Sequence, residues 1–242
     1  MENNNITNEI AVKYENIYLR AQNAAEKAGR SIGDIKIIAV SKLHPAKVIE
    51  SASAAGLKCF GENYVQELTD KYDILSNKGL NDLEWHFIGH LQTNKVRNIT
   101  PFVNYIHSVD SFKLADEISK RAVLAERDIN ILIQMNTSGE SSKSGCQPDY
   151  AVELISQLST LQNIKIKGLM TIGTFTDDEK IQREEFTVLR ETLNDVNSQL
   201  SLNLKELSMG MTGDFETAID EGATMVRIGT AIFGSRNYRN FR

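Results

Sequence analysis

Residues 35–42 read Ile-Lys-Ile-Ile-Ala-Val-Ser-Lys, a nearly continuous apolar run that ends in a lysine. Such runs are typical of parallel strands that are covered on both faces. Seven comparable runs follow, and a helical pattern separates each run from the next. They span residues 57–60, 84–88, 103–107, 129–135, 164–172, 205–209 and 224–228. Strict alternation of this kind suits a doubly wound sheet or a barrel, and the count of eight favours an α/β fold of the (β/α)8 TIM-barrel type.

An extra helix is expected in front of the first strand. Ile10, Tyr14 and Ile17 begin one apolar stripe, and Gly29 supplies a stop signal, so the pattern predicts a helix over residues 10–28. The chain has three prolines and no Pro/Gly-rich linker, which favours a single domain over residues 1–242. We expect residues 231–242 to close the last helix and to pack on the outside.

Composition and charge argue against two classes of partner. Hydrophobic residues make up 41% of the chain and charged residues 24%, as in ordinary globular proteins. The net charge is -5, with 27 basic and 32 acidic residues and no basic run, which argues against a nucleic-acid partner. The polar start lacks an apolar signal segment, and no run approaches transmembrane length. We therefore expect a cytoplasmic protein with no membrane partner.

Metal chemistry is not indicated by the spacing of cysteines and histidines. Cys59 and Cys146 form no CxxC pair, so neither a zinc signature nor a disulfide framework is present, and Cys59 is expected to be a small core residue. His86 and His90 have no third ligand at metal spacing, and we expect them to hydrogen-bond in the core or in a loop. The motifs HExxH, GxxxxGK, GxSxG and GxGxxG are absent, which weighs against metalloproteases, NTPases, serine hydrolases and Rossmann dehydrogenases.

Two loops with glycines and hydroxyls follow the last two predicted strands. Active sites of such barrels form at the C-terminal ends of the strands. Residues 208–213 and 227–230 offer backbone N–H groups just before helix starts, where anions bind well. A phosphate site is a recurring use of these two loops. The alternative is that Gly210, Gly213 and Gly229 merely make turns.

Lys42 and Arg227 are the charged candidates at the predicted barrel mouth. A lysine at the end of an apolar strand is desolvated, which lowers its pKa and lets the amine attack an aldehyde. The alternative interpretation is that the Lys42 side chain extends to solvent or pairs with a carboxylate. Arg227 lies inside the eighth strand and stays charged, so it needs a partner, either a core carboxylate or a ligand ring or phosphate.

Seven segments together resemble the pyridoxal phosphate homeostasis protein family. They run in order from residue 39 to residue 234, so the resemblance covers essentially the whole chain. They are residues 39–42 (AVSK), 60–67 (FGENYVQE), 85–92 (WHFIGHLQ), 136–145 (NTSGE with SKSG), 168–172 (GLMTI), 207–211 (LSMGM) and 226–234 (VRIGTAIFG). The resemblance implies a barrel like the N-terminal domain of alanine racemase, with pyridoxal 5'-phosphate (PLP) as the cofactor.

The resemblance also implies a role for particular residues. Lys42 would carry PLP as a Schiff base, and Arg227 would approach the pyridine nitrogen. Asn63 and Met170 would line the ring pocket. The phosphate would be held by Ser208, Gly229 and Thr230 and by the backbone of Gly210, Met211 and Thr212. One departure is Thr212-Gly213, where the family often has a serine followed by another residue, although threonine keeps the hydroxyl.

The resemblance favours a PLP-binding protein without strong catalytic activity. An arginine at the pyridine nitrogen disfavours ring protonation and weakens the electron sink. Racemases of similar barrel take a second base from a β-rich domain, for which this chain leaves no room. We therefore expect a monomer that sequesters PLP and supplies it to PLP-dependent apo-enzymes. One alternative is an amino-acid racemase with His86, Tyr64 or Ser41 as second base, and a weaker one is a Schiff-base aldolase acting on a phosphorylated sugar.

Overall fold

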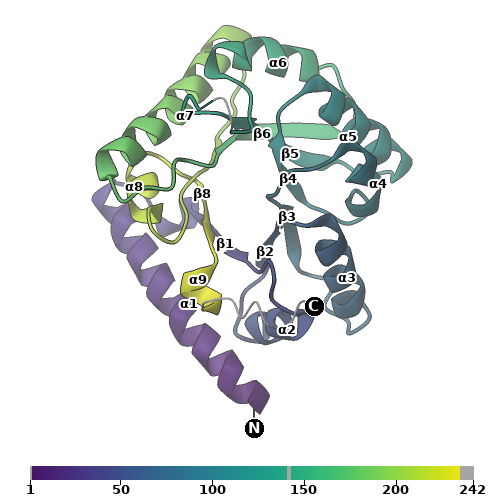
Figure 1. The fold of residues 1–242 in the computed structure, drawn as a ribbon, viewed down its shortest axis with the longest axis vertical. Helices are drawn as coiled ribbons and strands as arrows, with labels where there is room; N and C mark the ends of the chain where they lie inside the picture. The colour runs from purple at the N-terminus through teal and green to yellow at the C-terminus, as the bar shows by residue number, and fades with distance from the viewer. Residues whose placement is uncertain (1, 141–142, 235–242) are drawn as a thin grey trace.

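Eight parallel strands close into a barrel in the computed structural model, which describes residues 2–140 and 143–234 (Figure 1). Each strand pairs with its neighbours in chain order, and β8 returns to pair with β1. The strands are β1 (Lys36–Val40), β2 (Cys59–Glu62), β3 (Glu84–Phe87), β4 (Tyr105–Val109), β5 (Ile129–Met135), β6 (Ile164–Thr171), β7 (Glu206–Ser208) and β8 (Met225–Ile228). The predicted TIM barrel is confirmed.

Helices surround the barrel and connect its strands (Figure 1). The α-helices are α1 (Glu2–Lys27), α2 (Ala46–Ala54), α3 (Val65–Ser76), α4 (Val96–Ile99), α5 (Phe112–Leu124), α6 (Ala151–Leu158), α7 (Glu179–Leu200), α8 (Phe215–Asp220) and α9 (Thr230–Phe233). Short 3-10 turns are η1 (Ile32–Asp34), η2 (Thr93–Lys95) and η3 (Pro148–Tyr150). The extra helix α1 packs beside α2, α8 and α9. Within the described residues, no helix is long and apolar enough to cross a membrane.

Several boundaries differ from the sequence predictions. Helix α1 begins at Glu2 and not at Ile10, because Ile6 extends the apolar stripe by one turn and packs on the core. Strand β2 spans residues 59–62 where 57–60 was predicted, and β4 spans residues 105–109 where 103–107 was predicted. In both cases the strand is fixed by pairing with its neighbours, which local hydrophobicity does not reveal. Of the predicted tail, residues 235–242 lie outside the described part of the chain.

The barrel interior is divided between apolar and polar side chains. One apolar cluster inside the barrel consists of Ile38, Tyr105, Leu132, Met170 and Met225. Polar side chains inside the barrel come from β1, β3, β4, β7 and β8, and they include Lys36, Glu84, His86, His107, Glu206, Ser208 and Arg227. Buried polar groups are costly unless they are hydrogen-bonded. These side chains are therefore expected to hydrogen-bond to one another. The part of this polar network at the C-terminal ends of the strands reaches the candidate site.

Candidate functional site

A cavity of about 350 Å³ lies at the C-terminal ends of the strands, where the sequence predicts the site. Its volume falls within the range of small-molecule sites. Of the ten predicted site residues, seven line it, namely Lys42, Asn63, Met211, Thr212, Arg227, Gly229 and Thr230. These seven residues lie on β8 and in the segments that follow β1, β2, β7 and β8.

The backbone on both sides of Lys42 is held by side chains of the β2–α3 segment. Ser41 Oγ donates a hydrogen bond to Glu62 Oε1 at 2.6 Å, and Leu43 N donates to Glu67 Oε1 at 2.6 Å. Leu43 has a φ of 65°, which is unfavourable for a bulky side chain and persists only where the surroundings support it. Lys42 therefore leaves its strand on a fixed backbone and extends to the cavity wall.

Buried Lys71 joins the two carboxyl groups of this arrangement. Lys71 Nζ donates to Glu62 Oε1 at 2.6 Å, to Glu67 Oε1 at 2.8 Å and to Ser41 O at 2.8 Å. Burial raises the pKa of Glu62 to about 7, although the Lys71 ammonium opposes the shift. We call Ser41, Leu43, Glu62, Glu67 and Lys71 the Lys42 clamp. Burial of Glu62 within the clamp thus favours its protonated form.

Asn63 offers an unsatisfied acceptor at the cavity. Its Oδ1 atom is buried and has no hydrogen-bond partner among the described residues. A buried polar atom without a partner costs roughly 1–3 kcal/mol. The Asn63 backbone is approached closely by Gly89, where a Cβ atom would lie 2.2 Å from Asn63 O. A donor on a bound molecule would satisfy the amide oxygen, so this atom points to a ligand.

The loop after β7 is shaped by one glycine and one carboxyl group. Gly210 has a φ of 90°, and a Cβ atom there would lie 2.5 Å from Ala218 Cβ, so only glycine fits. Met211 N donates to Asp214 Oδ1 at 2.5 Å, so this predicted phosphate donor is already engaged. Burial raises the pKa of Asp214, although the hydrogen bond from Met211 and the charge of Arg227 oppose the shift. Thr212 and Gly213 remain on the cavity wall.

Arg227 is buried at the inner end of the cavity with neutral partners. Its NH1 group donates to Ser208 Oγ at 2.8 Å, and its NH2 group donates to Thr171 O at 2.8 Å. Of the two partners considered from the sequence, a contacting core carboxylate is not found among the described residues. Burial lowers the pKa of Arg227 to about 10, and Asp214 opposes the shift. The guanidinium therefore stays charged at neutral pH, and two of its five N–H donors are used.

A chain of hydrogen bonds continues from Ser208 down through the barrel interior. Ser208 Oγ lies 2.9 Å from His107 Nδ1, and His107 Nε2 lies 2.7 Å from His86 Nδ1. His86 Nε2 lies 3.1 Å from Glu84 Oε1, which also accepts from Lys36 Nζ at 2.6 Å. The prediction that His86 hydrogen-bonds in the core is confirmed. His90 is exposed and takes no part in this chain.

Three predicted site residues lie away from the cavity wall. Met170, Ser208 and Gly210 are all buried and are not among the described residues that line the cavity. The Met170 side chain is packed inside the barrel with Ile38 and Leu132 instead of facing the site. Contacts of these three residues with a cofactor remain predictions.

The loop after β6 forms a wall that the sequence analysis did not assign. Its lining residues are Ile172, Thr174, Phe175, Thr176 and Asp177, together with Gln182 at the start of α7 and Ile88 after β3. Phe175 is 99% exposed, so a large apolar ring stands at the rim of the cavity. The sequence could have indicated this loop, because it follows a predicted strand and every such loop lies at the same end of the barrel as the site.

Comparison with known proteins places this barrel in a family. The alanine racemase N-terminal domain family matches residues 12–237. A pyridoxal phosphate homeostasis protein of Pseudomonas aeruginosa is 44% identical over 229 residues, which are 95% of this chain and 96% of that protein. The structure of PipY from Synechococcus elongatus PCC7942 with PLP bound is 36% identical, with a TM-score of 0.81 over 93% of this chain and all (100%) of that chain.

A more distant structure shares the fold alone. Alanine racemase from Corynebacterium glutamicum has a TM-score of 0.69 at 19% identity, and the match covers 98% of this chain and 64% of that one. The closed barrel and the matched segment thus define a barrel of the alanine racemase N-terminal domain class. Within this class, the chain belongs to the pyridoxal phosphate homeostasis protein family.

Proposed function

We propose that this chain binds PLP covalently through Lys42, as a Schiff base, and keeps it in reserve without strong catalytic activity. The observation that carries the proposal is a cavity of about 350 Å³ that gathers Lys42, the Arg227 guanidinium and Asn63, whose Oδ1 atom has no hydrogen-bond partner in the described part of the chain. PLP supplies an aldehyde that links to an amine and a pyridine ring that withdraws electrons. Because PipY, a relative at 36% identity, is known with PLP bound, the same ligand is the first one to test here.

The phosphate of the ligand would lie against the loops after β7 and β8. Thr212, Gly213, Gly229 and Thr230 line this side of the cavity, and hydroxyl and backbone N–H groups are suitable phosphate donors. Arg227 lines the same cavity and would face the pyridine ring of the ligand. Ser208 and Gly210 would act from behind the wall, with Ser208 holding Arg227 and Gly210 giving the loop its path.

Arg227 explains why we propose binding rather than fast catalysis. Its guanidinium only donates hydrogen bonds and stays charged at neutral pH. A pyridine nitrogen beside it would therefore accept a hydrogen bond and remain unprotonated. An unprotonated ring is a weak electron sink, so the chemistry that follows PLP linkage would be slow.

The racemase alternative lacks a second base in the right place. His86 lies in the barrel interior between Glu84 and His107, and Ser41 Oγ is bonded to Glu62. Tyr64 is 54% exposed, and none of these three candidates lines the cavity within residues 2–140 and 143–234. We therefore propose a cytoplasmic, monomeric PLP reserve that supplies PLP-dependent apo-enzymes and is not an enzyme itself.

An absorbance spectrum with and without PLP tests the proposal. We expect a new band on loading, its loss on borohydride reduction, and a reduced PLP adduct on Lys42 in peptide mapping. Lys42→Ala should abolish the band, whereas Lys47→Ala, at an exposed position on α2, should keep it. An adduct on another lysine would contradict the proposal, and a colourless protein after PLP addition would favour the aldolase reading. Rapid racemisation of an amino acid that is lost in Lys42→Ala would overturn the reserve role.

A further inference from the structure

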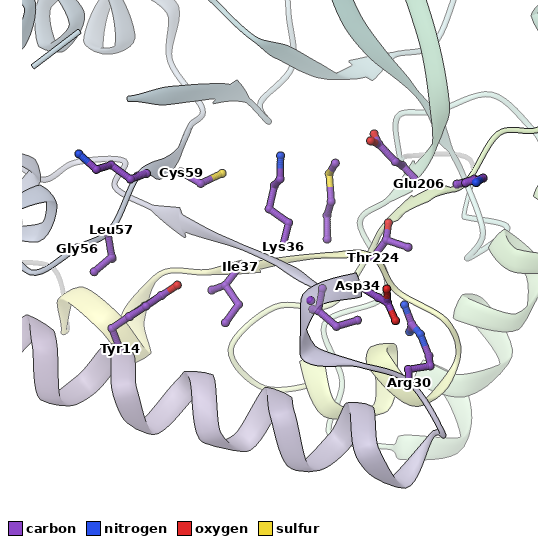
Figure 2. A pocket seen from close by; sticks show the side chains of 15 residues that line it. Tyr14, Arg30, Asp34, Lys36, Ile37, Gly56, Leu57, Cys59, Glu206 and Thr224 are labelled. Atoms are coloured by element: carbon purple, nitrogen blue, oxygen red, sulfur yellow. The ribbon is translucent and has the colours of Figure 1, made fainter. Parts of the chain in front are cut away.

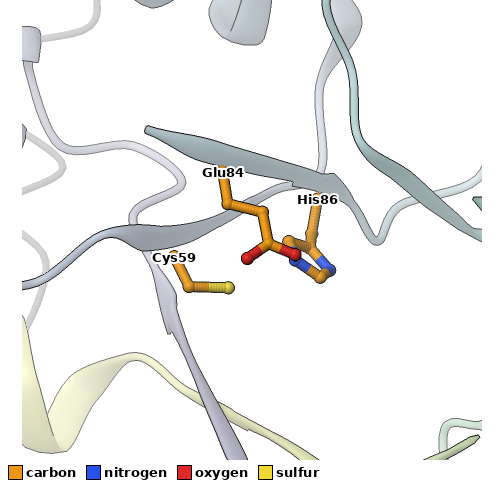
Figure 3. Close-up of side chains that lie close together, drawn as sticks. All are labelled: Cys59, Glu84 and His86. Atoms are coloured by element: carbon orange, nitrogen blue, oxygen red, sulfur yellow. The ribbon is translucent and has the colours of Figure 1, made fainter. Parts of the chain in front are cut away.

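A mixed group of sulfur, oxygen and nitrogen donors lies at the opposite end of the barrel from the PLP cavity. Cys59 on β2 is the register partner of Glu84 on β3, and His86 follows two residues later on the same face of β3 (Figure 3). One potential ligand atom of each residue lies within 4.8 Å of those of the other two. Because all three side chains project from paired strands, the backbone that positions them is rigid.

We propose that Cys59, Glu84 and His86 form a binding site for a divalent metal ion of the Zn²⁺ class. Thiolate, imidazole and carboxylate are the ligands that Zn²⁺ uses in proteins, at about 2.0–2.3 Å. Ca²⁺ and Mg²⁺ need six or more oxygen ligands, so a donor set with one sulfur and one nitrogen disfavours them. Three protein ligands leave a fourth position open for water. This site goes beyond the proposed PLP function and does not depend on it.

The ring of His86 is already oriented for such a role. It stacks on Tyr105 with ring centroids 4.6 Å apart and an angle of 2° between the planes. Its Nδ1 atom is 2.7 Å from His107 Nε2, which leaves Nε2 facing Glu84 and the other donors. Histidines that bind metals usually donate a hydrogen bond from their second ring nitrogen, as His86 Nδ1 would to His107 Nε2 in the metal-bound state. The neighbouring residues thus fix the orientation of the ring, and metal binding changes only its tautomer.

A large cavity reaches one of the three donors, the thiol of Cys59. It has a volume of about 760 Å³ and lies below the barrel, with Tyr14 of α1 on one side (Figure 2). Cys59, Lys36 and Glu206 line it, and Figure 2 shows their side chains on the barrel side of the cavity. The thiol of Cys59 is therefore reachable from this cavity without opening the fold.

Lys36 occupies the position of a competing cation. Its ammonium donates to Glu84 Oε1 at 2.6 Å and lies 5.2 Å from the centroid of the Tyr105 ring. A metal ion would have to displace this ammonium from Glu84. Glu206 provides an alternative partner, because its Oε2 atom is buried without a hydrogen bond among the described residues, while Oε1 accepts from Tyr105. The same structure thus contains an acceptor for the displaced lysine.

The charges of the bound state balance. When its sulfur binds the metal, the Cys59 thiol gives one proton to water in the cavity of about 760 Å³, because a thiol binds a metal as the thiolate. The thiolate and the Glu84 carboxylate then neutralise the two charges of the ion, and His86 binds as a neutral ring. Lys36 and Glu206 form a second neutral pair. No net charge is left buried at the floor of the barrel.

Cobalt binding tests this site, because Co²⁺ bound to a thiolate gives a near-ultraviolet charge-transfer band. We expect the full chain, without PLP, to bind one Co²⁺ with this band, and we expect Zn²⁺ to displace it. Cys59→Ser should abolish the band, and Cys146→Ser, which changes the other free cysteine, should keep it. The partly exposed position of Cys59 allows the serine variant to fold, and thermal melting verifies that it does.

Two further variants separate a metal site from a structural effect. Lys36→Gln should tighten Zn²⁺ binding, because it removes the competing ammonium while leaving the three ligands in place. His107→Asn should weaken Zn²⁺ binding by about 10- to 100-fold, as expected for a residue that orients a ligand. Absence of stoichiometric Co²⁺ binding, or a band that survives Cys59→Ser or disappears in Cys146→Ser, would overturn the proposal. Weaker Zn²⁺ binding in Lys36→Gln would do the same.

Discussion

His86 Nδ1 and His107 Nε2 lie 2.7 Å apart in the barrel interior, and the groups on either side of this pair determine which nitrogen carries the proton. Burial opposes ionisation of Glu84, but hydrogen bonds from His86 and Lys36 outweigh it and lower the pKa of Glu84 to about 2. A carboxylate only accepts, so His86 Nε2 must carry a hydrogen. Burial lowers the pKa of both histidines, so both are neutral. His86 Nδ1 then accepts from His107 Nε2, and His107 Nδ1 accepts from the Ser208 hydroxyl.

The first prediction is that both histidines are Nε2–H tautomers that do not titrate near neutral pH. Nitrogen-15 NMR of the imidazole rings measures the tautomer and its pH dependence directly. We expect neutral Nε2–H signals for His86 and His107 through the range near pH 6.5 where an exposed imidazole gains its proton. The assignments can be made by comparison with His107→Asn. An Nδ1–H signal from either ring in metal-free protein would contradict this order of hydrogen bonds.

The second prediction concerns the clamp beside Lys42. Glu67→Ala removes the acceptor of Leu43 N and one partner of Lys71, and it leaves Leu43 in an unfavourable conformation. We expect the free energy of unfolding to fall by about 2 kcal/mol, the usual range for a lost hydrogen bond to a charged group. Urea denaturation measures the change. Gln66→Ala, at an exposed position of the same helix, is the control and should change stability by less than about 0.5 kcal/mol.

The clamp also affects PLP binding if the proposed function is correct. Because the clamp fixes the backbone on both sides of Lys42, Glu67→Ala should lower the affinity for PLP more than Gln66→Ala does. Titration of the absorbance band gives both affinities. Equal affinity in the two variants would show that the clamp does not position Lys42.

The third prediction is a pH dependence of stability that arises at Glu62. Burial raises the pKa of Glu62 to about 7 in the folded chain, above its ordinary value near 4.5. Between these two values the folded state holds a proton that the unfolded state has lost. Stability from this group is therefore present below pH 4.5 and is lost as pH rises through 7, with a slope approaching about 1.4 kcal/mol per pH unit.

Glu62→Gln isolates this contribution, since glutamine keeps an acceptor oxygen for Ser41 and Lys71. Urea denaturation across this pH range gives the slope for each protein. We expect the wild-type free energy of unfolding to fall with rising pH more steeply than that of the variant. Parallel curves for the two proteins would rule out titration of Glu62 in this range.

The sequence predicted the architecture because local patterns determine it. Each apolar run that forms a strand is visible on its own, and so is the lysine that ends the first run. The mouth of the barrel follows directly, because the C-terminal ends of parallel strands meet at one end. The sequence therefore places Lys42, Asn63, Arg227 and Gly229 at this end, and in the structure all four line one cavity.

Features that depend on pairing between strands were not predicted. The register between β5 and β6 shifts by one residue after Ile131, which determines the face on which Met170 lies. On the other side of β6, Gly168 allows β7 to approach closely, because a Cβ atom there would lie 1.8 Å from Glu206 O. The pairing of Cys59 with Glu84 is likewise a property of two strands and not of one. The spacing of residues in the sequence therefore does not show that Cys59 and Glu84 lie beside His86, whereas the fold brings the three together.

The fourth prediction separates two glycines of the loop after β7. Gly210→Ala places a Cβ atom 2.5 Å from Ala218 Cβ at a φ of 90°. We expect a loss of about 2–4 kcal/mol in the free energy of unfolding, from steric overlap and backbone strain together. Gly213→Ala meets no described atom within 4 Å and should change stability by less than about 0.5 kcal/mol. Thermal or urea denaturation of both variants checks the difference, and equal losses would contradict it.

The last prediction links the proposed metal site to the upper cavity. A metal ion on His86 Nε2 requires that nitrogen to release its hydrogen to solvent. A hydrogen then moves from His107 Nε2 to His86 Nδ1 and another from Ser208 Oγ to His107 Nδ1, and Ser208 Oγ regains one from solvent, so that both rings stay neutral as Nδ1–H tautomers. His86 Nδ1 then donates to His107 Nε2, and His107 in turn donates from Nδ1 to Ser208 Oγ, which also accepts from Arg227. Zn²⁺ should therefore convert His107, which is not a ligand, from Nε2–H to Nδ1–H in the nitrogen-15 spectrum. Cys59→Ser should suppress the conversion at the same Zn²⁺ concentration. If Zn²⁺ bound at Cys59 while His107 kept its Nε2–H tautomer, His86 would not be a ligand through Nε2. The hydrogen bonds from His86 to Arg227 would then be unchanged by the metal.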